Sequence, residues 1–355
     1  MIKKYYIVAV STLSLVFIVI SSTGCMKSNT EDRNTANVVR LSSNTTNSYR
    51  FFNPELEQTR ARVPQLDPVT QLYVEEVKSG LFYVTDGIYQ SAFLKTDAGI
   101  VVFDAPPSFA YKLPDIIKQR SENEVIKYLV YSHGHTDHIG GVSAFSNIQG
   151  LQVIAPLNVA ENIKEQGYSG VLPATITFQD QYNFDLGAEK IELKSAAYHS
   201  EDSDVFIYLP KQKFIMAVDT ITPGEAPFMD FGATADIGEY LKFFDEVLKY
   251  DFDIILSGHV SNLGNRDDVI VSRDYAFDVR DTVLKAIPTV MDRFGKAMAA
   301  FGKDANGNLA YRSAIESIRG ECSTQIINRW KDRLSVVDVW VDSHCEKMIL
   351  HYLMH

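Results

Sequence analysis

The feature that most constrains this chain is a run of four potential metal ligands within six residues. The run follows residues 127–131, an apolar and aromatic segment that predicts a strand. Residues i and i+2 of an extended chain face the same way, so the first two histidines can bind one ion, and Gly134 between them permits a tight turn. As the chain turns into a helix, the next two ligands point toward a second ion. The run predicts a dinuclear metal site, against the alternative of a polar loop with solvated histidines; its ligands are His133, His135, Asp137 and His138.

Three further ligands are expected at the ends of other predicted strands, where loops display side chains on a rigid scaffold. Taken singly, each has the alternative reading of a capped or core-satisfied polar residue. Their shared placement favours a role at the metals. These ligands are His199, Asp219 and His259, which follow the segments 193–197, 214–218 and 254–257.

The order H-x-H-x-D-H, a spaced His, a strand-ending Asp and a Gly-His pair resembles the metallo-β-lactamase superfamily over about residues 80–265. The resemblance implies an α/β fold, an αββα sandwich of two mixed β-sheets flanked by helices, with the site at one edge. It also implies which residues hold which ion. One ion is expected to bind His133, His135 and His199, the other Asp137, His138 and His259, with Asp219 bridging the two.

By the same resemblance the chain is an enzyme, a metal-dependent hydrolase. Two neighbouring cations lower the pKa of a shared water, so that hydroxide is available near neutral pH as the nucleophile. Asp137 is the expected catalytic residue as well as a ligand, because it can orient the hydroxide and relay its proton. We expect two zinc ions per chain, although imidazole and carboxylate ligands also suit iron and manganese. Asp104, after the segment 100–103, is either an acid that supports the site or a turn cap.

The N-terminal residues predict export. Two lysines precede an apolar run, 5–20, that ends in small residues. Residues 1–24 are therefore predicted to be a signal peptide, with an uncleaved membrane anchor as the alternative. The small residues before Cys25 resemble the bacterial lipoprotein signal, which implies lipidation of Cys25; Ser22 departs from the usual aliphatic residue and leaves plain secretion open. We expect a periplasmic or envelope location, with the membrane reached through this lipid anchor.

Composition along the mature chain predicts three regions. Residues 25–66 are polar and predict a flexible tether, 67–265 the catalytic domain, and 266–355 a mainly helical region that covers the site or forms an interface. Cys322 and Cys345 are the remaining cysteines of a chain sent to an oxidising compartment, so we expect a disulfide between them, with two buried thiols as the alternative. The tail histidines are interpreted as structural or exposed; they are His344, His351 and His355.

Hydrophobic periodicity supports this division. The segment 336–341 alternates like a strand but also fits a helix. The predicted strands are 81–84, 90–94, 100–103, 127–131, 152–155, 190–194, 205–209, 214–218 and 252–256. The predicted helices are 113–120, one after His138, 157–166, 237–250, 269–287, 291–301 and one around 311–334.

The substrate class is narrowed by charge and by missing residues. The net charge of −11, without a cluster of Lys and Arg, argues against nucleic acid as a partner. Without a cysteine near Asp219, the lactamases that use a cysteine ligand are disfavoured. Lactamases with an all-histidine first site stay open, and in that alignment Thr220 faces the metals in place of Asp219.

A small ester, lactone or amide is the expected substrate, with a β-lactam among the options, because export argues against a glutathione thioester. Residues 226–229 offer such a molecule an apolar wall, unless these side chains are core. An alternative of a different class is an envelope lipoprotein with a binding or partner-docking role and a non-catalytic metal site. The oligomeric state is left open.

Overall fold

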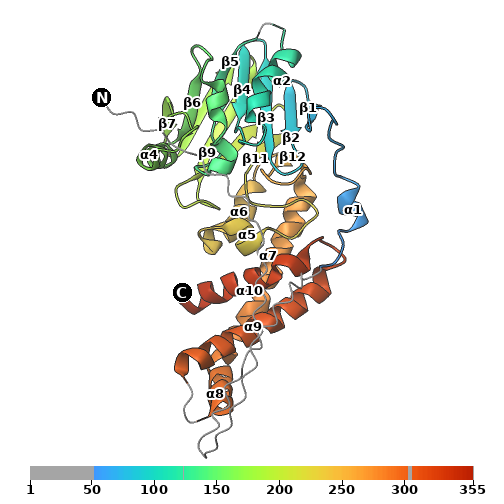
Figure 1. Ribbon diagram of the computed structural model, residues 1–355, viewed down its shortest axis with the longest axis vertical. Helices are drawn as coiled ribbons and strands as arrows, with labels where there is room; N and C mark the ends of the chain where they lie inside the picture. The colour runs from blue at the N-terminus through green and yellow to red at the C-terminus, as the bar shows by residue number, and fades with distance from the viewer. Residues whose placement is uncertain (1–51, 123, 303–305, 355) are drawn as a thin grey trace, which may run out of the picture. The chain divides into compact units, whose positions relative to one another are not determined.

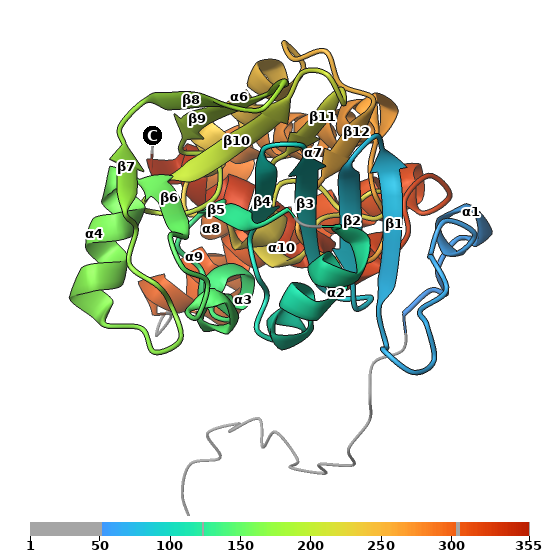
Figure 2. The same ribbon diagram turned by 90° about the horizontal axis from the view of Figure 1, so that it is seen from above.

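A computed structural model describes residues 52–122, 124–302 and 306–354 (Figure 1). Within these ranges the strands form two mixed sheets of seven and five strands that pack face to face. Helices cover the outer face of each sheet, as Figure 2 shows from above. The predicted αββα sandwich with a helical C-terminal region is therefore confirmed.

The seven-stranded sheet follows the order of the chain. Its first four strands form an antiparallel meander, and its last four are parallel because helices or loops carry the chain back between them. The strands are β1 (Tyr73–Lys78), β2 (Leu81–Thr85), β3 (Gln90–Thr96), β4 (Gly99–Phe103), β5 (Ile126–Val130), β6 (Gln152–Pro156) and β7 (Ile176–Phe178).

The five-stranded sheet is antiparallel except for its last pair, β11 and β12, which is parallel. The chain crosses over between those two strands through helix α6 (Ile237–Val247), in the usual manner of parallel neighbours. The strands, in spatial order, are β12 (Ile254–Leu256), β11 (Phe214–Met216), β10 (Asp204–Leu209), β9 (Glu189–Ala196) and β8 (Gln181–Leu186).

Strand periodicity explains why the central strands are apolar on both faces. In β4, Val101 and Phe103 enter the core between the sheets, whereas Ile100 and Val102 point to the opposite side. That outer core packs against α2 (Leu113–Arg120), α3 (Thr136–Ile139), α4 (Leu157–Gln166) and the 3₁₀ turns Ala110–Lys112 and Val142–Phe145.

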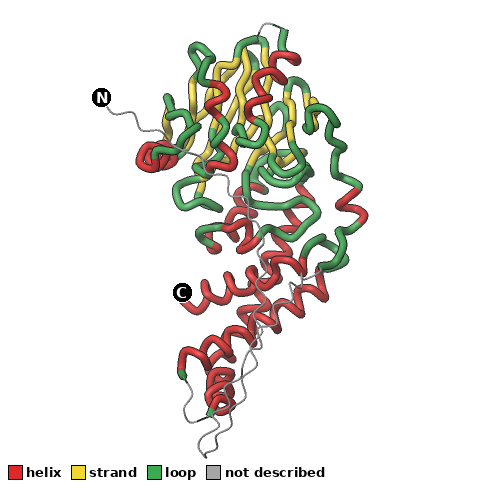
Figure 3. Tube along the Cα trace, in the orientation of Figure 1, coloured by secondary structure: helices red, strands yellow, loops and turns green. Residues whose placement is uncertain are grey.

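Helices dominate the chain after the sandwich, as the colours of Figure 3 show. Asn265 caps the first of them with a capping box, and Pro288 lies in a 3₁₀ turn, Ile287–Thr289, that separates it from the next. Together with α6 these helices share one apolar core with the outer face of the five-stranded sheet. They are α7 (Arg266–Ala286), α8 (Val290–Phe301), α9 (Gly307–Trp330) and α10 (Val337–Met354).

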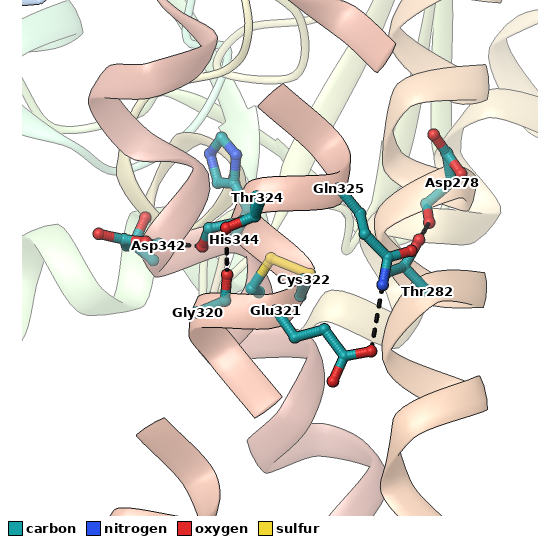
Figure 4. The surroundings of a disulfide bond; sticks show 12 residues. Asp278, Thr282, Gly320, Glu321, Cys322, Thr324, Gln325, Asp342 and His344 are labelled. Carbon is teal, nitrogen blue, oxygen red and sulfur yellow. Dashed lines mark hydrogen bonds between the residues drawn. A yellow bond between two sulfur atoms is a disulfide. The ribbon is translucent and has the colours of Figure 1, made fainter. Parts of the chain in front are cut away.

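A disulfide joins α9 to α10 through Cys322 and Cys345, as the sequence predicts (Figure 4). Around it, Ser323 donates a hydrogen bond to Asp342 at 2.6 Å, which links the same two helices. On the other side of α9, the carboxylate of Asp278 in α7 accepts hydrogen bonds from Arg329 and Trp330. The three helices are therefore tied by covalent, polar and apolar contacts.

Several elements differ from the sequence prediction. The segment 336–341, for which the sequence left strand and helix open, is helical from Val337 onward as the first part of α10, and Val336 precedes the helix with φ of 53°. Three short strands, β1, β7 and β8, escaped prediction because polar residues interrupt them and only one side chain in each of β7 and β8 is fully buried.

The N-terminal predictions fall mostly outside the described residues. The expected signal peptide, Cys25 and the tether up to residue 51 lie there. Residues 52–66 pack against the folded unit: in them α1 (Glu57–Arg60) is followed by Arg62, which forms an ion pair with Asp268 of α7. Among the helices of the described ranges, none has an apolar stretch of the length a membrane crossing requires.

Candidate metal centre

The seven predicted ligands meet at one edge of the sandwich. Strands β9, β11 and β12 run in the same direction, so their carboxyl ends reach the same edge, and from them follow His199, Asp219 and His259. The facing sheet contributes the loop after β5. There, a bend after the strand carries His133, His135 has extended backbone, and the short helix α3 carries Asp137 and His138.

A first group of ligand atoms comes from three imidazoles and one carboxylate. His199 Nε2 lies 3.3 Å from His135 Nδ1 and 3.2 Å from Asp219 Oδ2. His133 Nε2 lies 3.5 Å from the same carboxylate oxygen. All four ligand atoms lie within 4.8 Å of one another.

A second group lies beside the first. His138 Nε2 and His259 Nε2 are 3.2 Å apart, and Asp137 Oδ2 lies 3.6 and 3.5 Å from these two nitrogens. Asp219 belongs to both groups, because its Oδ1 lies 3.1 Å from His259 Nε2 while its Oδ2 faces the first. Thr220, the alternative residue, donates its hydroxyl to the carbonyl of Ala217. The geometry therefore favours Asp219 as the shared carboxylate.

The donor atoms fit two metal ions. A tetrahedral site with bonds of about 2.0–2.1 Å places its ligand atoms about 3.3–3.4 Å apart, close to the separations in both groups. Two pairs of imidazole nitrogens face each other, and His133 Nε2 is buried without a hydrogen bond. Buried nitrogens that converge without a proton donor between them suit a shared cation. The cluster is compatible with a dinuclear metal site.

Burial and mutual charge set the electrostatics of the cluster. Burial alone would raise the pKa of Asp219, but His138, His199 and His259 hold that pKa well below its usual range. Burial, and then the neighbouring His138, lowers the pKa of His133 well below its ordinary value, which keeps this imidazole neutral. The side chains of Asp137 and His259 are 40% and 38% exposed, whereas that of His133 is 1% exposed. Each group therefore combines buried ligands with ligands that reach the solvent: His135 is exposed in the first group, and His138 is buried in the second.

Two side chains outside the cluster hold the ligand loops. The buried carboxylate of Asp204 accepts the backbone N–H groups of Tyr198, His199 and Ser200 at 2.8–3.1 Å. Burial raises the pKa of Asp204 to about 6. On the opposite side, the amide oxygen of Gln90 accepts the N–H groups of Ser257 and Gly258, next to His259.

The backbone around the cluster is strained where it must turn sharply. Asp219 and Asp104 have φ of 62° and 57°, in the left-handed region that non-glycine residues seldom adopt. Asp104 is fully buried, accepts the N–H of Ser132 at 2.8 Å, and lies close enough to His138 for each charge to affect the other's pKa. Gly258 also has positive φ, and a Cβ there would lie 2.4 Å from Val218, so this position requires glycine.

An apolar pocket of about 550 Å³ opens onto the cluster. Tyr89 lines it with its ring 5.0 Å from that of His259, and Phe228 packs against Trp340 of α10 with ring centroids 4.8 Å apart. Of the apolar wall predicted at 226–229, all but Met229 line the pocket, with Phe228 the large side chain among them. Sequence reasoning missed Tyr89, Gln90, Asp204 and Trp340, since none belongs to a ligand motif.

This sandwich, with His and Asp ligands gathered at one edge, defines a class of metal-dependent enzymes. Residues 84–259 match the model of the metallo-β-lactamase superfamily, and the chain belongs to that superfamily. Its members are generally metal-dependent hydrolases.

Comparison with known proteins supports the same placement. The chain is 23% identical over 210 residues to the 2,4-dinitroanisole O-demethylase subunit alpha of Nocardioides sp. (strain JS1661), a match over 58% of this chain and 62% of that relative. A metallo-β-lactamase from Pontibacter korlensis has a similar fold with a TM-score of 0.51 and 21% identity, over 57% of this chain and 98% of its own. The inverting sec-alkylsulfatase Pisa1 from Pseudomonas sp. has a TM-score of 0.55 and 17% identity, over 79% of this chain and half of its own.

Proposed function

We propose that this protein hydrolyses a small ester, lactone or amide with two metal ions, most simply zinc. The observation that carries the proposal is the convergence of seven ligand side chains, five of which line an apolar pocket. Pockets of this size and character bind small organic molecules, and the cluster lies where the reacting bond of such a molecule would be held.

The ligand set divides between the two ions. His133, His135 and His199 would hold one, Asp137, His138 and His259 would hold the other, and Asp219 would bridge them. Bound metal ions would supply Lewis acidity and lower the pKa of water at the site toward 7.

The chain's own groups supply orientation and proton transfer. Asp137 lines the pocket and is part exposed, so its carboxylate can orient the attacking water and accept its proton. Water's oxygen then bonds to the acyl carbon, the bond to the leaving group breaks, and the leaving group takes up the proton. Phe228 and Trp340 exclude bulk water from one side of the pocket.

Cleavage of an aryl methyl ether is a second candidate reaction. It is favoured by the name of one relative, a 2,4-dinitroanisole O-demethylase subunit, and by the aromatic side chains of the apolar pocket. The match spans 62% of that relative, so the whole relative's activity enters only as a reaction to be assayed.

Metal content and hydrolysis of a substrate panel test the proposal together. The full-length protein would be stripped of metal, reloaded separately with zinc, iron(II) or manganese(II), and assayed on an aryl ester, a lactone, a β-lactam, a thioester and 2,4-dinitroanisole. We expect two bound ions per chain and metal-dependent cleavage of at least one ester, lactone or amide. His135→Ala should lower that rate by at least about a hundredfold. Replacing residues that only support the ligands already lowers metal affinity or activity by about 10–100-fold.

His351→Ala is the matched control, because it removes a histidine that lies outside both ligand groups. It should retain metal content and activity. Protein that binds two ions but cleaves none of the panel, or that binds none, would overturn the hydrolase proposal and favour a binding role at the cell envelope. Cleavage of 2,4-dinitroanisole alone would favour the second candidate.

A further inference from the structure

The charged side chains that surround the metal cluster, apart from its ligands, all have the same sign. Besides the apolar pocket, a polar pocket of about 690 Å³ reaches the cluster from the other side of His135 and His199. Among the described residues that line these two pockets, none is Lys or Arg. Beyond the ligands, the charged side chains there are all acidic: Glu225 in the apolar pocket, and Glu201 and Asp202 in the polar one.

Glu225 is held firmly in its place at the apolar pocket. Its N–H donates to the carbonyl of Thr222 at 2.9 Å, and its backbone forms a bridge with Ser335, just before α10. Burial and the neighbouring carboxyl group of Glu55 raise the pKa of Glu225 to about 7. Above that pH this half-buried residue therefore gives the pocket wall a negative charge.

Large apolar side chains of the apolar pocket are exposed. Ile88 and Phe228 are 61% and 53% exposed at its rim, and Trp340 stands against Phe228. Exposed apolar side chains gathered around a pocket mark a surface that binds an apolar ligand. An aromatic group can lie against Phe228 and Trp340 in an offset or edge-to-face arrangement.

We propose that the substrate carries an aromatic or other planar apolar group and no negative charge away from the bond that is cleaved. Bound metals would attract an anion most strongly at the reacting bond, and this attraction weakens with distance along either pocket. A carboxylate, sulfate or phosphate placed farther along either pocket meets acidic or apolar side chains, which raises its free energy. A positive charge is tolerated at the same position. This inference rests on the proposed hydrolase function and disfavours the β-lactam antibiotics within it, since they carry a carboxylate.

Three aryl acetates that differ in the charge of the para substituent test the proposal: 4-tert-butylphenyl acetate, 4-carboxyphenyl acetate and 4-(trimethylammonio)phenyl acetate. Their kcat/KM values with zinc-loaded full-length protein at pH 8, each divided by the rate constant for alkaline hydrolysis of the same ester, compare one charge at one position. We expect the neutral and cationic esters to be preferred over the anionic one by at least about tenfold. Equal or better hydrolysis of the anionic ester would overturn the proposal.

Variants of Glu225 assign the effect to this residue. Glu225→Gln should reduce the preference against the anionic ester, and Glu225→Lys should reverse it. Glu165→Gln, on the exposed face of α4 and outside both pockets, is the matched control and should keep the wild-type preference. An unchanged preference in Glu225→Lys would contradict the role of Glu225.

A binding measurement separates this proposal from the hydrolase proposal. Metal-free protein would be titrated with methyl benzoate and with monomethyl terephthalate while tryptophan fluorescence is recorded, so that no ion can bind the carboxylate. We expect the neutral ester to bind more tightly, with a signal that Trp340→Phe removes, because Trp330 is buried away from the pocket. If no ester is hydrolysed but this order of binding holds, the hydrolase proposal fails alone; tighter binding of the carboxylate overturns the inference alone.

Discussion

At the scale of single residues, two ligand loops are held by side chains that do not reach the cluster. Asp204 accepts hydrogen bonds from three backbone N–H groups around His199, and Gln90 accepts two from backbone N–H groups beside His259. Such contacts fix the direction of an imidazole because its own torsions start from a rigid backbone. Residues that orient metal ligands in this way tune affinity almost as strongly as the ligands.

Replacing Gln90 by leucine should weaken one of the two metal sites. Leucine has a side chain of similar volume to glutamine, but it leaves the buried N–H groups of Ser257 and Gly258 without acceptors, at a cost of about 1–3 kcal/mol each. We expect zinc affinity at the group containing His259 to fall by about 10–100-fold, with a smaller effect on the other group. Competition with a coloured chelator measures both affinities.

Gln119→Leu, on the exposed side of α2, serves as the control for a glutamine lost elsewhere. It should bind two zinc ions as the wild type does. If Gln90→Leu lowered thermal stability and left both affinities unchanged, Gln90 would be a packing residue without influence on the metal site.

The ligands themselves could be predicted from sequence, whereas these supporting residues could not. His133, His135, Asp137 and His138 are neighbours in the chain, so local spacing alone suggests ligands for two adjacent ions. Gln90 contacts Ser257 and Gly258, which follow it by 167 and 168 positions, and no local sequence pattern predicts such a contact. Asp204 reads as an ordinary polar residue at the start of a strand.

At the scale of elements, the turn α5 (Met229–Ala233) is a left-handed one packed under the metal site. Asp230, Phe231 and Gly232 have φ of 54°, 60° and 81°, and the two non-glycine residues each cost roughly 1 kcal/mol. Gly232 packs so closely on Asp219 that a Cβ would lie 2.5 Å from its carbonyl oxygen. The turn therefore supports the bridging carboxylate from below.

Contacts with helix α10 offset the cost of this backbone strain. Ser343 accepts the N–H of Asp230 at 2.9 Å, and the ring of Phe231 stacks on that of His344 at 4.3 Å. His344 Nε2 lies 3.0 Å from the carbonyl oxygen of Phe228, and its Nδ1 lies 2.8 Å from the hydroxyl of Tyr275. Since a carbonyl only accepts, Nε2 carries the proton and Tyr275 donates to Nδ1. His344 is thus a neutral imidazole, hydrogen-bonded through both ring nitrogens, that links α10 to the wall of the pocket.

This arrangement predicts a loss of stability in mild acid. Burial lowers the pKa of His344 from 6.5 to about 4. The unfolded chain therefore takes up a proton between these pH values that the folded chain does not, so the unfolding free energy falls as pH decreases from about 6.5 toward 4. The full loss is about 3 kcal/mol, because one pKa unit corresponds to about 1.4 kcal/mol. Urea unfolding of metal-free protein at several pH values measures it.

His344→Gln is the comparison, since glutamine can donate to the carbonyl of Phe228 but does not titrate. The variant should be less stable at neutral pH and should lose less stability on acidification than the wild type. Both proteins contain the same metal-binding histidines, so their contribution cancels. Parallel pH profiles would show that His344 does not carry this dependence.

The start of helix α10 is a segment for which the local pattern left strand and helix open. Val336, Val337, Val339 and Val341 favour extended backbone by propensity, and the segment alternates with polar residues. The helix forms because Val337 and Val341 lie one turn apart and enter the same core as α7 and α9. Tertiary packing overrides β propensity here.

At the scale of the whole molecule, the helical region completes the site of the sandwich. The N–H of Ala226 donates to the carbonyl of Ser335, and Ser335 donates its own N–H to Gly224, so the pocket wall and the start of α10 are paired. Trp340 and Val336 then line the apolar pocket. The sandwich supplies the metal ligands and most of the pocket lining, and the C-terminal region adds these two side chains to the pocket wall.

The disulfide should make this whole unit more resistant to unfolding. It closes a loop across a sequence separation of 23 between α9 and α10, for which chain entropy predicts a stabilisation of roughly 3 kcal/mol. The Cys322→Ala/Cys345→Ala variant should unfold at a lower guanidinium concentration than the oxidised wild type. Its midpoint should not respond to a reductant, whereas that of the wild type should fall. Equal midpoints for all samples would show that the bond does not contribute to stability.

The sequence by itself determined the chemistry of the site and the class of fold. Ligand residues, strand ends and amphipathic helices are encoded in short segments whose periodicity is set by backbone geometry. The tertiary structure alone decided that Asp219 rather than Thr220 joins both ligand groups, that Gln90 and Asp204 support the loops, and that α10 walls the pocket. These outcomes depend on contacts between residues far apart in the chain, and the free energy of such contacts exists only once the chain is folded.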